Sequence, residues 1–295
     1  MTQPPPGTDG TPVQQPQACY RHPERGTYIS CARCGRPICT ECMRPAPVGF
    51  QCPDCIGEAA RTVRQPLTVV GGPLITRPYV TYSLIAINVA LFGVSFLLGI
   101  NELAENFGMW PFGIVLYGEW WRLITAAFLH GGLLHVAFNM YVLFALGPTL
   151  ERVLGHVRFV VLYLVAALGG SIASYVFSDP RTVSVGASGA IFGLMGALIV
   201  AGRRLRWDIR QVLILLAVNV VIGFISPSVD WRAHFGGLVV GALVAGVFVW
   251  TPPMFRSSRV LWQVLGVLAI CMGLIVVTVW RTGQVWDLLA PVGVG

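Results

Sequence analysis

A serine and a histidine, each at the start of an apolar segment, are the residues of this chain best suited to covalent chemistry. Ser188 lies in the stretch Gly186-Ala187-Ser188-Gly189, which opens one apolar run, and His234 opens another. A serine hydroxyl becomes a nucleophile when a neighbouring base removes its proton, and a histidine can supply that base. Because polar groups in hydrocarbon are costly, their default interpretation is functional. The pair predicts acyl-transfer chemistry at membrane depth.

Other side chains have the spacing to complete such a site. His135 and Asn139 are four residues apart, so they share one face of an expected helix and can donate hydrogen bonds to an oxyanion. The backbone N–H of Ser188, near a helix N-terminus, is a further donor. Phe192, one turn after Ser188, can present its ring to His234. No carboxylate is expected inside a helix to orient the imidazole, which favours a dyad over a triad.

Small residues accompany both reactive side chains at helical spacing. They let two membrane helices approach closely, as a serine–histidine hydrogen bond requires. Taken alone, glycine and serine in a membrane helix are most often packing residues, and it is their combination with the other polar residues at one depth that indicates a site. The glycines are Gly189 and Gly193 beside Ser188, and Gly237 and Gly241 on the His234 face.

The composition places these residues in a membrane. Of 295 residues, 55% are hydrophobic and only 11% are charged, with a mean hydropathy of +0.70, whereas a soluble domain has about 25% charged residues. All 20 basic residues are arginines, and the formal charge is +7. They lie between apolar runs, where they set membrane orientation, so nucleic-acid binding is not expected. No secretory signal peptide is visible in the polar N-terminal stretch, and the N-terminus is expected to stay in the cytosol.

Seven apolar runs predict seven helices, most of them long enough to cross a hydrocarbon core of about 30 Å. The run 188–202 is short, and is expected to be central and surrounded by other helices. Residues 101–122 are aromatic but interrupted by Gly and Pro, so they are expected in the membrane interface. His130 is expected to cap the start of the second helix. The runs are 80–100, 131–150, 157–178, 188–202, 209–226, 234–251 and 260–280.

The arginines also predict the topology. More of them fall in the loops that share the N-terminal side than in the opposite loops, which puts the N-terminus in the cytoplasm and, after seven crossings, the C-terminus outside. Ser188 and His234 then begin helices that run inward from the extracytoplasmic face. The first side has Arg61, Arg64, Arg77, Arg152, Arg158, Arg203, Arg204, Arg206, Arg210, Arg256 and Arg259, and the other has Arg122, Arg181, Arg232 and Arg281.

The segment before the first apolar run has the ligand pattern of a double zinc site. Seven of the eight cysteines fall between positions 19 and 55, and one histidine completes four half-sites of two ligands each. Two tetrahedral zinc ions need eight such ligands. A disulfide framework is the alternative, which an odd cysteine count and a reducing cytosol disfavour. The expected ligands are Cys19, His22, Cys31, Cys34, Cys39, Cys42, Cys52 and Cys55.

The order of these ligands resembles the B-box and related small double-zinc modules. That resemblance implies interleaved pairing, in which the first and third half-sites share one ion and the second and fourth share the other. A module this small has almost no apolar core, so metal binding would supply most of its folding free energy. Both ions are expected to be structural, because closed four-ligand sites leave no open position.

The motifs of the membrane part resemble those of the rhomboid intramembrane serine proteases. The resemblance spans the helices from about residue 80 to residue 251 and implies a six-helix core, with Ser188 as nucleophile and His234 as general base. It also implies an oxyanion site made by His135, Asn139 and the Ser188 amide, and a water-filled cavity open to the outside. The run 260–280 is an addition to that core. The matching motifs are Trp121-Arg122, His135-x3-Asn139, Gly186-x-Ser188-Gly189, and His234 with Gly237 and Gly241.

Together these observations predict an all-α membrane protein with a small zinc-stapled N-terminal domain. The expected parts are a disordered tail (1–17), a double zinc module (18–57), a linker (58–78), a six-helix rhomboid-like core (79–252) and a seventh helix with a C-terminal tail (253–295).

The expected function is an intramembrane serine endopeptidase of the cell membrane that cleaves transmembrane segments of protein substrates in the lipid bilayer. The zinc module is expected to have a cytosolic protein-binding or regulatory role. The alternative is a rhomboid-like scaffold that binds transmembrane helices without cutting them. A transporter is disfavoured because no acidic residue is expected inside a span and no inverted repeat is apparent.

Overall fold

The computed structural model describes residues 15–62, 67–68, 70–226, 229–255 and 257–289. Residues 1–14 of the predicted tail, and residues 63–66 and 69 of the predicted linker, lie outside this range. The chain divides into two compact units, residues 1–65 and 66–295, which are described separately.

The first unit contains little regular structure. Its buried core consists of Ile38 and six cysteines, with Tyr20 and Met43 packed against it. So small an apolar core cannot by itself stabilise a domain of this size. Two antiparallel strand pairs and one helix frame the cysteines: β1 (Gln17–Ala18) with β2 (Gly26–Thr27), β3 (Arg44–Pro45) with β4 (Phe50–Gln51), and α1 (Pro53–Thr62).

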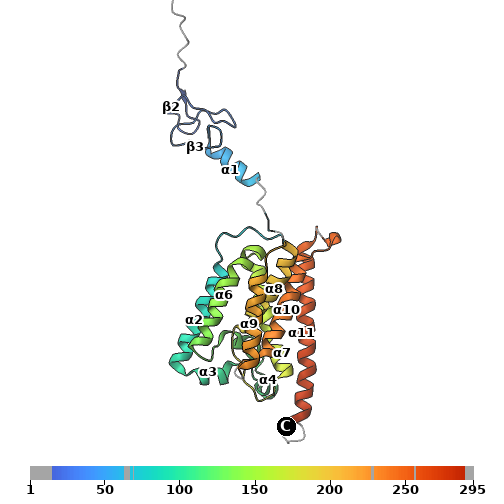
Figure 1. Ribbon diagram of the computed structural model, residues 1–295. Coiled ribbons are helices and arrows are strands. Elements are labelled where there is room, and N and C mark those ends of the chain that lie inside the picture. The colour runs from blue at the N-terminus through green and yellow to red at the C-terminus, as the bar shows by residue number, and fades with distance from the viewer. Residues whose placement is uncertain (1–14, 63–66, 69, 227–228, 256, 290–295) are drawn as a thin grey trace, which may run out of the picture. The chain divides into compact units, whose positions relative to one another are not determined.

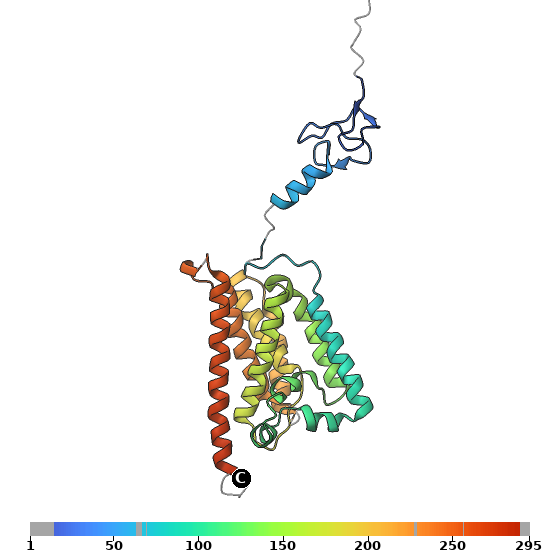
Figure 2. The same ribbon diagram turned by 180° about the vertical axis from the view of Figure 1, so that it is seen from behind.

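The second unit is a bundle of long apolar helices (Figures 1 and 2). Among the described residues, six helices are long and apolar enough to cross a membrane, and α9 (Arg210–Ile225) is a shorter apolar helix of 16 residues. All seven predicted runs are therefore helical, which confirms the all-α membrane fold with its additional C-terminal helix. The six are α2 (Tyr79–Leu98), α6 (Leu133–Leu154), α7 (His156–Phe177), α8 (Ser188–Leu205), α10 (Trp231–Val249) and α11 (Arg259–Leu289), and a short turn η2 (Pro253–Phe255) precedes α11.

Helix α8 is central in this unit, and α2 and α11 lie at opposite edges (Figures 1 and 2). Two-thirds (67%) of its apolar window is buried by neighbouring helices, compared with 6% for α11. It packs against α10, α7 and α6. Because protein rather than lipid surrounds α8, its 18 residues suffice, as the sequence predicts.

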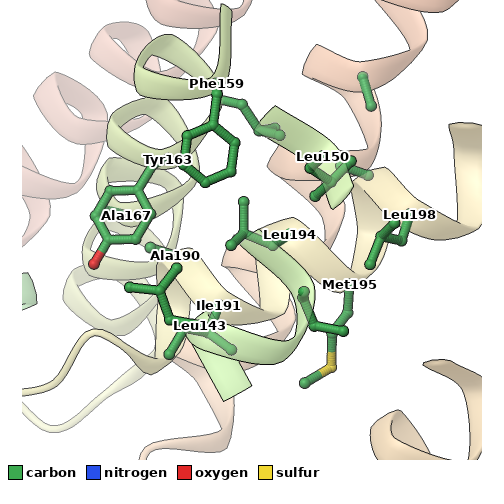
Figure 3. Close-up of a cluster of buried hydrophobic side chains, with 14 of the residues drawn as sticks. Leu143, Leu150, Phe159, Tyr163, Ala167, Ala190, Ile191, Leu194, Met195 and Leu198 are labelled. Carbon is green, nitrogen blue, oxygen red and sulfur yellow. The ribbon is translucent and has the colours of Figure 1, made fainter. Parts of the chain in front are cut away.

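The main apolar core lies where α6, α7 and α8 meet (Figure 3). Helix–helix association inside lipid depends mainly on van der Waals packing, since the lipid is as apolar as the side chains. This close-packed region gives α8 a rigid support. The labelled residues are Leu143 and Leu150 from α6, Phe159, Tyr163 and Ala167 from α7, and Ala190, Ile191, Leu194, Met195 and Leu198 from α8.

The segment between α2 and α6 folds into short helices held by one arginine. Arg122 is 3% exposed, and its Nε donates to Glu119 Oε2 at 2.6 Å. Its Nη1 donates to the carbonyls of Glu105 (2.7 Å) and Gly108 (2.9 Å). One guanidinium therefore fixes three parts of the segment. The helices are α3 (Ile100–Phe107), α4 (Pro111–Tyr117), α5 (Arg122–Thr125) and η1 (Ala126–Phe128).

The expectation that no acidic residue lies inside a membrane helix was wrong. The predicted run ends at residue 150, but α6 continues and includes Glu151, which has no exposed surface. Its carboxylate accepts hydrogen bonds from Val80 N (2.9 Å), Thr81 N (2.8 Å) and Thr81 Oγ1 (2.6 Å), and His156 Nδ1 lies 2.6 Å from it. The carboxylate caps the start of α2, where Pro78 makes no capping bond. Glu151 is therefore a fully bonded structural group.

Candidate active site

Ser188 is the first residue of α8, and the backbone before it depends on a glycine. Gly186 has φ +139°, a conformation that residues with a side chain rarely adopt, and its N–H donates to the carbonyl of Ala126 at 2.9 Å. A Cβ at this position would lie 2.9 Å from His135 Nε2 and 3.5 Å from Ser188 Oγ. The missing side chain therefore leaves a small space that both His135 and Ser188 border.

His234 lies in the first turn of α10, which begins at Trp231, three residues before the predicted start. The Phe192 ring stacks on the imidazole, with a centroid separation of 4.1 Å and an interplanar angle of 15°. This confirms the contact that the spacing of Phe192 and Ser188 on α8 predicts. The stack restrains the plane of the histidine ring.

Glycines bring α8 and α10 into backbone contact. A Cβ at Gly237 would overlap the carbonyl oxygen of Gly189, and a Cβ at Gly241 would overlap the backbone of Gly193. Any larger residue on α10 at these two positions would push the helices apart. The close approach predicted from the two glycine pairs is confirmed.

The four predicted polar residues of the site line one cavity of about 1030 Å³: Ser188, His234, His135 and Asn139. Its wall also includes apolar side chains from α6, α7 and α9, with Phe138 and Ile222 among them. A cavity of this size, mainly apolar with a few convergent polar groups, is typical of a ligand or substrate site.

His135 and Asn139 have hydrogen-bond donors available to this cavity. The N–H of Gly131 donates to His135 Nδ1 at 3.3 Å, so the assigned tautomer has its proton on Nε2, the atom that borders the space at Gly186. Asn139 is 4% exposed, and its amide donates one hydrogen to the carbonyl of His135 at 3.1 Å, which leaves its second N–H. With the Ser188 N–H, these groups can stabilise an oxyanion.

The expected capping role of His130 was wrong. Helix α6 starts after Gly132 with no side-chain capping bond. His130 is instead 2% exposed, and its ring lies edge-on to that of His135, with centroids 5.1 Å apart. Neither of its ring nitrogens has a hydrogen-bond partner among the described residues.

One residue of the cavity wall, Asp230, has no counterpart in the sequence analysis. It immediately precedes α10 and accepts hydrogen bonds from the N–H groups of Arg232 (3.1 Å) and Ala233 (3.3 Å). Asp230 was not recognised as a capping residue, because the apolar run 234–251 places the start of α10 three residues too late. An aspartate just before the first helical residue is the N-cap signal that could have identified it.

Comparisons with known proteins agree with this geometry. A family model described as the Rhomboid domain matches residues 117–251. YdcA of Bacillus subtilis is 40% identical over 136 residues, which cover 44% of this chain and 68% of YdcA. The chain belongs to the rhomboid family. The residues matched by this family model include the four predicted polar residues of the cavity. They exclude the cysteine-rich unit and α11.

Two relatives with longer alignments are named as rhomboid proteases. The rhomboid protease GluP of Bacillus subtilis is 39% identical over 180 residues, 57% of this chain and 34% of GluP. The rhomboid protease AarA of Providencia stuartii is 26% identical over 213 residues, 61% of this chain and 75% of AarA. The chain spans only 34% to 55% of the length of three of its rhomboid relatives, GluP and the RHOMBOID-like proteins 5 and 6 of Arabidopsis thaliana.

Outside the rhomboid match, the eight cysteine and histidine residues form two groups of four. Within each group the ligand atoms lie within 4.8 Å of one another, and the order is interleaved, as the B-box resemblance implies. His22 uses Nδ1, which lies 3.3 Å from Cys39 Sγ and 3.5 Å from Cys42 Sγ. The groups are Cys19, His22, Cys39 and Cys42, and Cys31, Cys34, Cys52 and Cys55.

Groups around the second cluster favour the thiolate form of Cys34 and Cys31, which is the form that binds metal. The Arg36 guanidinium donates to Cys34 Sγ at 3.3 Å and lowers the pKa of that thiol. The N–H of Cys52 donates to Cys31 Sγ at 3.2 Å. Gly35, with φ +73°, allows the tight turn after Cys34. Four soft sulfur ligands in so small a space fit a tetrahedral metal ion.

Proposed function

We propose that this rhomboid protein is an intramembrane serine endopeptidase that cleaves the membrane-spanning segments of its protein substrates. The observation that carries the proposal is the single cavity lined by Ser188, His234, His135 and Asn139 within the rhomboid match. The protease names of GluP and AarA support the same activity.

In the first step, His234 removes the proton from Ser188 Oγ, and the oxygen attacks a substrate carbonyl carbon. The resulting oxyanion accepts hydrogen bonds from His135 Nε2–H, the Asn139 amide and the Ser188 N–H. The N-terminus of α8 adds the positive end of its helix dipole. The loss of one such donor lowers kcat by about 10²- to 10³-fold in a well-studied serine protease.

In the second step, His234 gives its proton to the leaving amine, and the peptide bond breaks. Water then enters the cavity, loses a proton to His234 and hydrolyses the acyl-enzyme. A helical substrate must unwind first, because an intact helix shields its carbonyls. Substrates with glycine or proline near the cleaved bond are therefore favoured, since these residues are the poorest helix formers.

We infer that the N-terminus lies in the cytoplasm, the C-terminus outside and the reactive serine near the extracytoplasmic face of the cell membrane. Arg203 and Arg204 in the last turn of α8, at the end opposite Ser188, support this orientation. Reporter fusions test it: an alkaline phosphatase fused after residue 289 should be active, and one fused before residue 15 should not.

We also infer that the cysteine-rich unit holds two structural zinc ions and binds a cytosolic protein. Tyr28 and Val48 are 70% and 80% exposed, which offers apolar surface to such a partner. The module (18–57) and the protease core (79–252) then act as separate domains. Elemental analysis of purified protein should find two zinc ions per chain, and fewer after Cys39→Ser.

The activity is tested by cleavage of a tagged single-span substrate in proteoliposomes. The purified full chain should cut it, and Ser188→Ala and His234→Ala should each abolish cutting. Cutting that survives Ser188→Ala contradicts the mechanism. A parent chain that binds the substrate helix without cutting it would instead support a non-catalytic rhomboid-like scaffold.

A further inference from the structure

Asp230 links the start of α10 to the end of α7. Its Oδ1 accepts the N–H groups of Arg232 and Ala233, which have no partner inside the helix. Its Oδ2 accepts the hydroxyl of Ser174 on α7. One carboxylate therefore both starts the helix that carries His234 and attaches that start to a second helix.

The attachment point on α7 is rigid. Ser174 has no exposed surface, and its hydroxyl oxygen lies 3.2 Å from that of Ser178. In the five residues before Ser174, α7 touches α10 closely, since a Cβ at Gly236 would overlap Ala173 and lie 2.6 Å from the carbonyl oxygen of Gly169. Asp230 thus fixes the first turn of α10 to a region that cannot shift easily.

Among the described residues, few other contacts restrain the imidazole of His234. Phe192 stacks on its ring. On the α9 side, a Cβ at Gly223 would lie 3.8 Å from His234 Nδ1. Asp230 lies one turn before the histidine, its carbonyl accepts the His234 N–H at 3.3 Å, and both residues line the cavity. The position of the ring therefore depends on how the first turn of α10 is held.

We propose that Asp230 is a positioning residue for His234: its bonds to α10 and to Ser174 hold the imidazole within reach of Ser188. The inference rests on the proposed protease function. A displacement of about 1 Å in a catalytic group can lower the rate by about 100-fold. The loss should appear mainly in kcat and not in KM, because the apolar side chains of the cavity wall are unchanged.

Three variants and a matched control test this role in the full chain. Asp230→Ala removes both bonds and should lower kcat by about 10- to 100-fold with little change in KM. Asp230→Asn keeps the oxygen that caps α10 and puts an NH2 group in place of Oδ2, which can donate to the Ser174 hydroxyl oxygen in a reversed bond. It should recover kcat to within about threefold of the parent, because asparagine caps helices as well as aspartate does. Ser174→Ala breaks only the bond to α7 and should give an intermediate loss. Asp179→Ala, in an exposed loop outside the cavity wall, should retain the parental kcat.

The outcomes separate this inference from the protease function. If the parent cuts and Asp230→Ala and Ser174→Ala both cut at the parental kcat, the positioning role is wrong and the protease function stands. Folded Asp230→Asn that is as slow as Asp230→Ala would also overturn it, since charge rather than geometry would then matter. A parent that does not cut, and whose Ser188 fails to react with a fluorophosphonate, removes the protease function itself.

Discussion

The cysteine-rich unit and the membrane bundle hold their reactive side chains in opposite ways. In the first unit the reactive groups are the core: six cysteines and Ile38 make up its buried apolar residues. In the bundle, the packed core of α6, α7 and α8 contains neither Ser188 nor His234, which lie at its margin in a cavity. A ligand of the first unit therefore cannot change without loss of the fold, whereas the two cavity residues can.

The two units also differ in the local features on which their structure depends. In the first unit we propose that metal ions take the place of apolar surface, because eight candidate ligands in about forty residues leave little else to bury. The bundle depends on positions without a side chain. Glycines on α8 and α10 permit the backbone contact that positions Ser188 and His234. Four substitution or removal experiments test this contrast, in order of decreasing expected effect.

Metal removal should have the largest effect and should be confined to the first unit. Structural zinc contributes about 10–16 kcal/mol in small zinc domains, so a chelator should unfold the cysteine-rich unit completely. Limited trypsin digestion should then cut within residues 15–62, while the bundle resists and substrate cleavage changes by less than about twofold. Cys39→Ser should reproduce the chelator effect. Cys271→Ser, on α11 and outside both ligand groups, should not.

A side chain at the α8–α10 contact should strongly destabilise the bundle. Gly237→Val places atoms where the carbonyl of Gly189 lies, which should lower the free energy of unfolding by about 3 kcal/mol or more and abolish cleavage. Gly273→Val on α11 is the matched control, because nothing lies within 4 Å of the added Cβ. Thermal unfolding in detergent gives both values. Equal stability of the two variants would show that α8 and α10 do not depend on close contact.

Neutralising the buried carboxylate should have a smaller effect on stability. Glu151→Gln weakens the hydrogen bonds from Val80 and Thr81, and should lower the free energy of unfolding by about 1.5–3 kcal/mol, the range for bonds to a charged group. Glu102→Gln, on the exposed side of α3, should change it by less than about 0.5 kcal/mol. A neutral result for Glu151→Gln would mean that the charge does not contribute to the capping of α2.

Removal of the ring beside the imidazole should have the smallest effect, and mainly on rate. Phe192→Leu loses a stacked pair worth about 0.5–1.5 kcal/mol, which corresponds to a fall in kcat of about 2- to 12-fold. Phe96→Leu, a 71% exposed position on α2, is the control and should leave kcat unchanged. A Phe192→Leu variant with parental kcat would show that the stack does not orient His234.

Much of the architecture follows from sequence pattern because apolar runs and paired ligands are local signals. The seven helices, the Phe192 stack and the glycine contact follow from spacing alone. Asp230 and Glu151 do not, because hydropathy marks where a helix is apolar and not where its polar capping residues lie. His130 shows a further limit: a polar residue just before a helix can be buried beside another side chain and cap nothing.

The most direct test of the account is the reaction of the full chain with a fluorophosphonate, with the modified residue identified by mass spectrometry. We expect modification of Ser188, its loss in His234→Ala, and its persistence after the metal ions proposed for the first unit are removed. Modification of a different serine, or of Ser188 at the parental rate in His234→Ala, would contradict a serine activated by His234. Loss of modification on metal removal would contradict the independence of the two regions.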